Sequence, residues 1–213
     1  MPESSDREDQ QPRSLRSEEA RQRRRRMMDA CHMRPLNSYV QHLRKRLGIE
    51  IPDFDPLDGG LHARALFLFE KPGPMTAAGP DQDGKGSGFI SRNNDDPSAQ
   101  ATCEFMEAAG IARTDTVTWN VVPGWNGTIK LTPAEVREGA LMVRELVLLL
   151  PKLRAIVFVG RKAERAHKHL KDLPLRFFSS THPSPKVKSI MPERWANIPN
   201  QWRGVQEYLS TLA

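Results

Sequence analysis

The chain has 213 residues, 38% of them hydrophobic, which is enough for one domain with a fully packed core. Its formal net charge is +6, distributed as +4 over residues 1–50, −6 over 51–151 and +8 over 152–213. Two widely separated cysteines argue against a disulfide framework and a cysteine metal site. No apolar run has membrane-spanning length and the N-terminus is not a secretory signal, so we expect an intracellular, cytoplasmic protein.

Residues 1–50 are predicted to form a flexible basic N-terminal extension with one or two helices. Residues 1–14 carry almost no apolar side chains and cannot bury enough surface to order themselves. Ser17 favours the start of a helix, and the arginine run 23–26 on it either contacts nucleic acid phosphates or forms a solvated basic face. A second helix, Leu36–Leu47, has apolar residues at helical spacing and is expected to pack on the domain.

Residues 51–213 are predicted to form an α/β domain, in which residues 51–60, rich in Pro, Asp and Gly, serve as a linker. Short apolar runs then alternate with helical segments. The predicted strands are Ala65–Phe69, Thr116–Val122, Ala155–Val159 and Leu175–Phe178. The predicted helices are Pro97–Ala109, Thr132–Leu150, Arg161–Leu170 and Glu193–Leu209, the last either continuous or interrupted near Pro199. This alternation predicts a three-layer α/β/α fold with a central four-stranded parallel sheet.

Distinctive residues follow three of the predicted strands. Glu70 follows the first strand, Asn120 lies near the end of the second, and His182 follows the fourth. Right-handed crossovers bring the carboxyl ends of parallel strands to one edge, so we expect these residues to line one pocket. Pro183 and Pro185 predict a stiff, extended loop around His182, whereas an isolated His-Pro pair would indicate a surface turn.

The chemistry of these residues suits a nucleobase that has been flipped out of a duplex. The Asn120 carboxamide can read the amide-like edge of a pyrimidine, and the Phe89 ring can stack on the base. A neutral His182 can donate to a carbonyl oxygen on which negative charge develops. Lys186 and Lys188, in the strongly basic final third of the chain, can hold phosphates.

In order and spacing these motifs resemble those of the uracil-DNA glycosylase superfamily, particularly its bacterial and archaeal iron-sulfur type, over roughly residues 63–210. Glu-Lys-Pro-Gly at 70–73 is similar to the family's Gly-Glu-Ala-Pro-Gly motif, and Gly-Phe-Ile at 88–90 to its Pro-Phe-Val stretch. Trp-Asn-Val-Val at 119–122 is similar to its Thr-Asn-Val-Val strand, and His-Pro-Ser-Pro at 182–185 matches its last motif.

The resemblance implies a monomeric, monofunctional DNA repair glycosylase that hydrolyses the N-glycosidic bond of uracil or another deaminated base. It implies that His182 contacts uracil O2, that Asn120 reads the base and that Phe89 stacks on it. Glu70 is the candidate for orienting the attacking water. The other residues predicted to bind substrate are Pro72, Gly73 and Lys71, and those predicted to contact DNA are Ser184, Pro185, Lys186, Val187 and Lys188. One of Val187, Ile190 and Met191 either acts as the apolar wedge that fills the vacated stack or belongs to the core.

The chain also departs from the family pattern. The four cluster cysteines are absent, so neither a cofactor nor a metal is expected. Phe69 replaces the first Gly, and Lys71 stands where several families place the Asp or Asn that positions water. Either Glu70 takes that role, helped by an ammonium group beside it, or electrostatics mainly assist water attack, or catalysis is weak.

Two alternatives stay open at this stage. Phe69 and Lys71 favour a non-catalytic nucleic-acid-binding protein that retains the glycosylase fold. A small-molecule hydrolase is the third interpretation, but the sequence has no Gly-x-Ser-x-Gly elbow, and the basic final third would then have no purpose.

Overall fold

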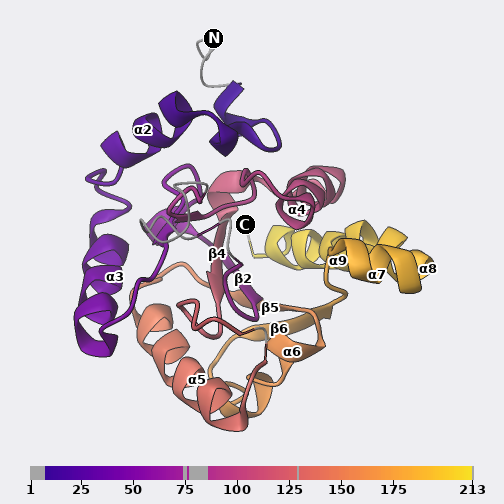
Figure 1. The fold of residues 1–213 in the computed structure, drawn as a ribbon. Coiled ribbons are helices and arrows are strands. Elements are labelled where there is room, and N and C mark those ends of the chain that lie inside the picture. The colour runs from indigo at the N-terminus through magenta and orange to yellow at the C-terminus, as the bar shows by residue number, and fades with distance from the viewer. Residues whose placement is uncertain (1–7, 74–75, 77–85, 129, 213) are drawn as a thin grey trace.

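The computed structural model describes residues 8–73, 76, 86–128 and 130–212. At its centre lies a four-stranded parallel sheet in the order β4–β2–β5–β6 (Figure 1). The strands are β2 (Ala65–Phe69), β4 (Thr116–Asn120), β5 (Ala155–Val159) and β6 (Arg176–Ser180). Phe69 lies opposite Asn120, and Val159 lies opposite Ser180, so the carboxyl ends of the strands meet at one edge. The predicted α/β fold with a parallel sheet is confirmed.

Helices cover both faces of this sheet because successive side chains of a strand point to opposite faces. Leu66 and Leu68 pack against one set of helices, and Ala65 and Phe67 pack against the other. The first set includes α3 (Arg34–Leu47) and α5 (Pro133–Leu148), and the second includes α4 (Pro97–Ala108) and α9 (Ile198–Ser210). Pro97 and Pro133 begin their helices after the capping side chains of Asp96 and Thr132, as the sequence indicates.

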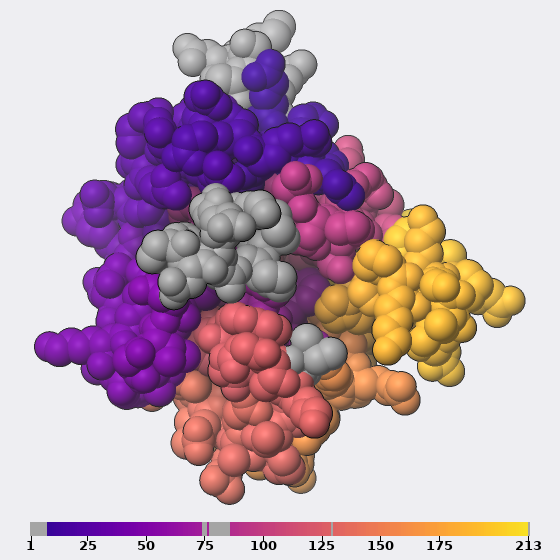
Figure 2. All heavy atoms as spheres, in the orientation of Figure 1, coloured from indigo at the N-terminus to yellow at the C-terminus, as the bar shows by residue number. Residues whose placement is uncertain are grey.

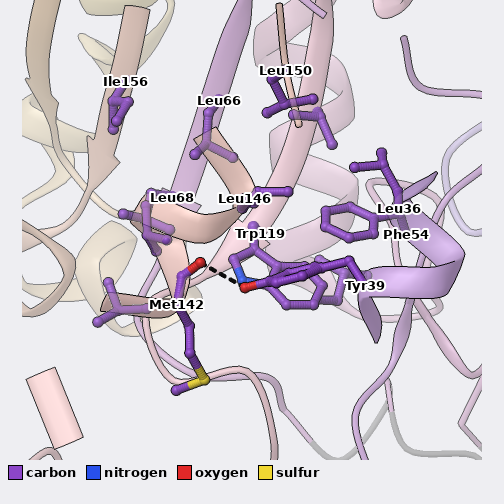
Figure 3. Close-up of a cluster of buried hydrophobic side chains, with 14 of the residues drawn as sticks. Leu36, Tyr39, Phe54, Leu66, Leu68, Trp119, Met142, Leu146, Leu150 and Ile156 are labelled. Atoms are coloured by element: carbon purple, nitrogen blue, oxygen red, sulfur yellow. Dashed lines mark hydrogen bonds between the residues drawn. The ribbon is translucent and has the colours of Figure 1, made fainter. Parts of the chain in front are cut away.

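Trp119 is the centre of the core on the first face (Figure 3). Its ring stacks on Phe54 with ring centroids 4.2 Å apart and lies tilted against Tyr39 at 6.2 Å. The Tyr39 hydroxyl donates a hydrogen bond of 2.6 Å to the backbone oxygen of Met142, which ties α3 to α5 (Figure 3). The expected packing of the helix at residues 36–47 on the domain is confirmed.

Residues 51–60, predicted to be a linker, are instead a largely buried part of the domain. Within them, β1 (Asp53–Phe54) pairs in parallel with β3 (Phe89–Ile90) in a separate two-stranded sheet. Asp and Pro normally indicate an exposed connection. Here the carboxylates of Asp55 and Asp58 are buried because arginines from distant parts of the chain neutralise them.

These arginines form a buried ionic network that connects the N-terminal helix α2 (Glu18–Arg26) to the domain. Asp55 accepts from Arg24 at 3.0 Å and from Arg113 at 2.7 Å. Asp58 accepts from Arg113 at 3.0 Å and faces Arg92 at 3.7 Å. Burial works against the charged form of Asp55, but Arg113 and Arg24 outweigh it and hold its pKa below the ordinary value.

The N-terminal residues pack on the domain from residue 8 onward. Leu15 and Ala20 form a small buried cluster with Phe89, and the Asn93 side chain donates to the backbone oxygen of Gln11 at 2.7 Å. Arg24, part of the predicted basic run, is fully buried. Residues 8–14, which the sequence predicts to lack buried surface, therefore pack on the domain, and residues 1–7 lie outside the described residues. The predicted boundary between residues 1–50 and 51–213 stays a prediction, but these contacts join the two parts.

The C-terminal third is more broken than the sequence predicts. The helix expected at 161–170 is α6 (Arg161–Glu164) followed by a 3-10 turn. The helix expected at 193–209 is interrupted close to Pro199, as the sequence allows, and forms α8 (Pro192–Ala196) and α9. Residues 181–184 form neither helix nor strand, which agrees with the loop expected around His182. From Pro185 onward the chain instead forms α7 (Pro185–Ile190), which is capped by the Ser184 side chain. The turn after α6 is His167–His169, and further 3-10 turns in the described residues are Ser14–Arg16, Gly60–His62 and Arg113–Asp115. Within the described ranges, no helix has the length and apolar character needed to cross a membrane.

Candidate active site

A cavity of about 460 Å³ opens at the carboxyl edge of the sheet, a size typical of small-molecule sites. It is lined by Glu70 after β2, Asn120 at the end of β4 and His182 after β6. Pro72 and Gly73, which the sequence also predicts to bind substrate, line it as well. The parallel topology thus brings residues more than a hundred positions apart to one cavity.

Asn120 is 3% exposed, and it ends the edge strand β4, where its backbone lies opposite Phe69 of β2. The next residue, Val121, donates to the backbone oxygen of Phe69 at 2.8 Å, which extends the pairing between β4 and β2 beyond the strand end. The Asn120 carboxamide forms no hydrogen bond with any described residue. One donor group and one acceptor group are therefore available to a ligand from a rigid position.

The His182 ring is held between two hydrophobic contacts. It packs edge-on against Phe69, with ring centroids 5.6 Å apart, and lies so close to Gly160 that a Cβ there would be 3.0 Å from the His182 Cβ. Burial lowers the pKa of His182, while Glu70 and Asp96 partly oppose that effect and Lys162 adds to it. His182 is therefore a neutral imidazole at pH 7, able to donate from one nitrogen and accept at the other.

Glu70 forms an ion pair with Lys162 on α6, with 3.0 Å between Oε1 and Nζ. Both side chains are partly exposed, and of the two only Glu70 is among the described residues that line the cavity. The sequence suggested that Lys71 would supply the ammonium group beside Glu70. In the structure Lys162 supplies it, from a helix 92 residues further along the chain.

The Lys71 ammonium is engaged elsewhere, although the residue lines the cavity. Its Nζ donates to Glu135 at 2.9 Å, to Asn126 at 2.8 Å and to two backbone oxygens of the loop before α5. The side chain is only 4% exposed. A hydrogen bond from the Thr132 backbone and the bond from Lys71 lower the pKa of Glu135 to about 2. Lys71 therefore fastens this loop to the start of α5.

Lys71→Met is expected to lower the free energy of unfolding by about 1–3 kcal/mol, because the loop oxygens and Glu135 lose a shared charged donor. Since the Glu135 pKa is depressed, this stabilisation is present above its ordinary value of 4.5 and is lost as the pH falls towards 2. Urea denaturation at pH 7 and pH 3 checks both points. Lys152→Met, at an exposed lysine, is the control, and an equal loss in both variants would contradict the assigned role.

Phe89 lies outside the cavity, contrary to its predicted stacking role. It is 1% exposed and packs against Leu15 and Ala20 from the N-terminal segment. Its neighbour Ile90 lines the cavity instead, since adjacent residues of a strand point to opposite sides. Among the described residues, Phe69 and Trp125 line the cavity with aromatic rings, in addition to the imidazole of His182.

The residues predicted to contact DNA, Ser184 to Lys188, form the capped start of α7 and do not line the cavity. Lys186 is exposed, and the Lys188 ammonium lies 4.6 Å from the centre of the Trp195 ring. Of the three wedge candidates, Ile190 is 62% exposed, whereas Val187 and Met191 are half-buried. The short helices α7 and α8 project at one edge of the molecule (Figures 1 and 2).

Sequence reasoning missed several polar residues of the cavity, among them Arg92, Thr118, Ser98 and Thr102. Thr118 could have been found from strand periodicity, because it lies two residues before Asn120 and therefore on the same face of β4. No sequence signal marks Arg92, which follows the short strand β3. In the part of the chain that the structure describes, no group of three or more His, Cys, Asp or Glu side chains is placed to hold a metal ion.

No protein-family model and no curated protein matches this chain. Among solved structures, the chain is similar to the solution NMR structure of a "putative Uracil DNA glycosylase" from Methanosarcina acetivorans. The two share 17% sequence identity with a TM-score of 0.46, over 68% of this chain and 92% of that chain. At this level of similarity the chain is not assigned to a family.

Proposed function

We propose that this protein is a monofunctional DNA glycosylase that hydrolyses the N-glycosidic bond of uracil, or of another deaminated base, after the base is flipped out of DNA. The observation that carries the proposal is the convergence of His182, Asn120 and Glu70 in one cavity. His182 is neutral at pH 7, and the Asn120 carboxamide has no hydrogen-bond partner among the described residues. This set fits a neutral base with an amide-like edge better than it fits an anionic metabolite.

His182 stabilises the charge that develops as the glycosidic bond breaks. Its Nδ1 is buried without a partner among the described residues, so the proton is assigned to Nε2, from which the neutral ring donates to the cavity. The bonding pair of the C1′–N1 bond passes to the base, and negative charge accumulates on the keto oxygen O2. A donor placed there in advance stabilises the transition state more than the ground state.

Glu70 acts on the water molecule that completes the reaction. The water oxygen forms the new bond to C1′, a proton from the water passes to the Glu70 carboxylate, and the departing base is protonated from solvent. The ion pair with Lys162 orients this carboxylate at the mouth of the cavity. Neither a covalent enzyme intermediate nor a Schiff base is needed for this sequence of steps.

The C-terminal helices supply the contact with DNA in this proposal. Lys186 and the rest of the basic segment 152–213 contact backbone phosphates, which fixes the register of the protein on the duplex. In this proposal Ile190, which is exposed on α7, fills the space that the base leaves. The stacking surface for the base is that of Trp125 or Phe69, not Phe89.

A base-release experiment tests the proposal. A labelled oligonucleotide with one uracil, in single- and double-stranded form, is incubated with the protein and then treated with alkali, which cleaves the strand at an abasic site. We expect cleavage at the uracil and none in a matched thymine control. Salt-sensitive DNA binding without release would replace the proposal with the non-catalytic interpretation. Absence of both binding and release would exclude the two together.

A further inference from the structure

The inner wall of the cavity carries polar atoms that the proposed mechanism does not use. Arg92 and Thr118 line the cavity and are buried, and neither Arg92 Nε nor Thr118 Oγ1 has a hydrogen-bond partner among the described residues. A buried polar atom without a partner costs about 1–3 kcal/mol. Such atoms are uncommon in native proteins, and a ligand or water that pairs them is a usual reason for them.

The position of these two residues is set by strand β4. Thr116, Thr118 and Asn120 alternate along this strand and therefore share one face. The Arg92 Nη2 donates to the Thr116 hydroxyl, and the same group faces the Asp58 carboxylate at 3.7 Å. The Arg92 guanidinium is thus anchored beside Thr116, which lies furthest from the carboxyl end of β4 among these three residues. Thr118 lies between that anchor and Asn120, roughly 6.6 Å inward from Asn120 along the strand.

We propose that Arg92 Nε and Thr118 Oγ1 form an inner subsite that binds a keto oxygen on the far edge of the extruded base. The inference rests on the proposed function and deepens it, because it makes both residues determinants of base specificity. An arginine side chain offers only donors. A keto oxygen accepts hydrogen bonds from Arg92 Nε and Thr118 Oγ1. An exocyclic amine at that position would direct its own N–H groups at Nε–H, and two donors form no hydrogen bond with each other.

The subsite is suited to a neutral acceptor and not to a phosphate. Asp58 already offsets the charge of Arg92. Asp58 in turn pairs with Arg113, and Arg113 pairs with Asp55. The group that the site lacks is therefore an acceptor, not a counter-ion. Uracil and hypoxanthine carry a keto oxygen where cytosine and adenine carry an amino group, so this pair selects deaminated bases over their parents.

Thr118→Val tests the subsite without disturbing the fold, because valine has nearly the same shape and the hydroxyl has no partner to lose. Two probes are titrated calorimetrically: 1-methyluracil and 1-methylcytosine, which share the ring and differ at the keto or amino position. We expect the wild-type protein to prefer 1-methyluracil at least about tenfold. Thr118→Val should reduce that preference several-fold and leave the thermal midpoint unchanged or higher.

Thr102→Val is the matched control, since Thr102 lines the same cavity but its hydroxyl donates to the Ser98 backbone oxygen at 2.8 Å. It should lower the thermal midpoint and leave the preference unchanged. Arg92→Lys is the second variant, because it keeps a positive charge near Asp58 and removes Nε. It should reduce the preference as Thr118→Val does.

The outcomes separate this inference from the proposed function. Base release that persists with an unaltered preference in both Thr118→Val and Arg92→Lys would overturn the subsite and leave the glycosylase proposal standing. A preference for 1-methyluracil that both variants reduce, in a protein that releases no base, would support the subsite and overturn the proposed reaction.

Discussion

His182→Ala is expected to reduce the rate of base release from a uracil-containing oligonucleotide by about 10²–10³-fold, the usual effect of removing one donor that stabilises a developing oxyanion. DNA binding should stay within about twofold of wild type, since the ring lies inside the cavity and not on the basic helices. Single-turnover cleavage and a binding titration measure the two effects separately.

The control for this variant is His42→Ala, at an exposed histidine on α3, which should retain full activity. His182→Asn adds a second comparison, because an amide donor in the same place should recover part of the lost rate. Full activity in His182→Ala, with folding verified by circular dichroism, would show that charge on the base is stabilised by another group.

The same residue predicts a pH dependence whose sign follows from burial. The pKa of His182 in the folded protein is below its ordinary value of 6.5. As the pH falls through 6.5, the unfolded chain takes up a proton before the folded protein does, so the free energy of unfolding decreases until the lowered pKa is passed. The decrease should be absent in His182→Ala. Base release in the wild type should continue below pH 6.5, because the neutral donor persists there.

Asp55→Asn is expected to lower the free energy of unfolding by about 3–5 kcal/mol, the largest stability effect that we predict. The Asp55 carboxylate accepts from Arg24 and Arg113, and the change leaves both buried guanidinium groups without this counter-charge. Asp55 also accepts from the Ser91 hydroxyl, and Ser91 lines the cavity, so base release should fall as well.

An exposed ion pair provides the comparison. Glu145→Gln breaks the contact between Glu145 and Arg46, 2.9 Å apart on the surface, and should cost less than about 1 kcal/mol because solvent screens that pair. Urea denaturation of both variants gives the two values. Similar losses for Asp55→Asn and Glu145→Gln would mean that the buried network contributes no more than a surface contact.

The fold could be predicted from the sequence because its determinants are local. Continuous apolar runs such as Ala65–Phe69 indicate strands buried on both faces, and a capping box with proline marks the start of α5. The parallel pairing that this alternation implies then places the carboxyl ends of the strands on one edge, without reference to any side chain. That rule was sufficient to predict that Glu70, Asn120 and His182 share a cavity.

The partners of the polar side chains were decided only by the tertiary structure. Lys71 pairs with Glu135 and not with the adjacent Glu70, and Phe89 turns away from the cavity because the N-terminal segment provides a place to bury it. Arg92 is placed beside Thr118 by contacts with Asp58 and Thr116, which lie 34 and 24 positions away. Strands follow from neighbours in the chain. A buried charged side chain instead pairs with an opposite charge that lies close to it in the folded structure. Hydrophobic periodicity does not indicate which residue that partner is.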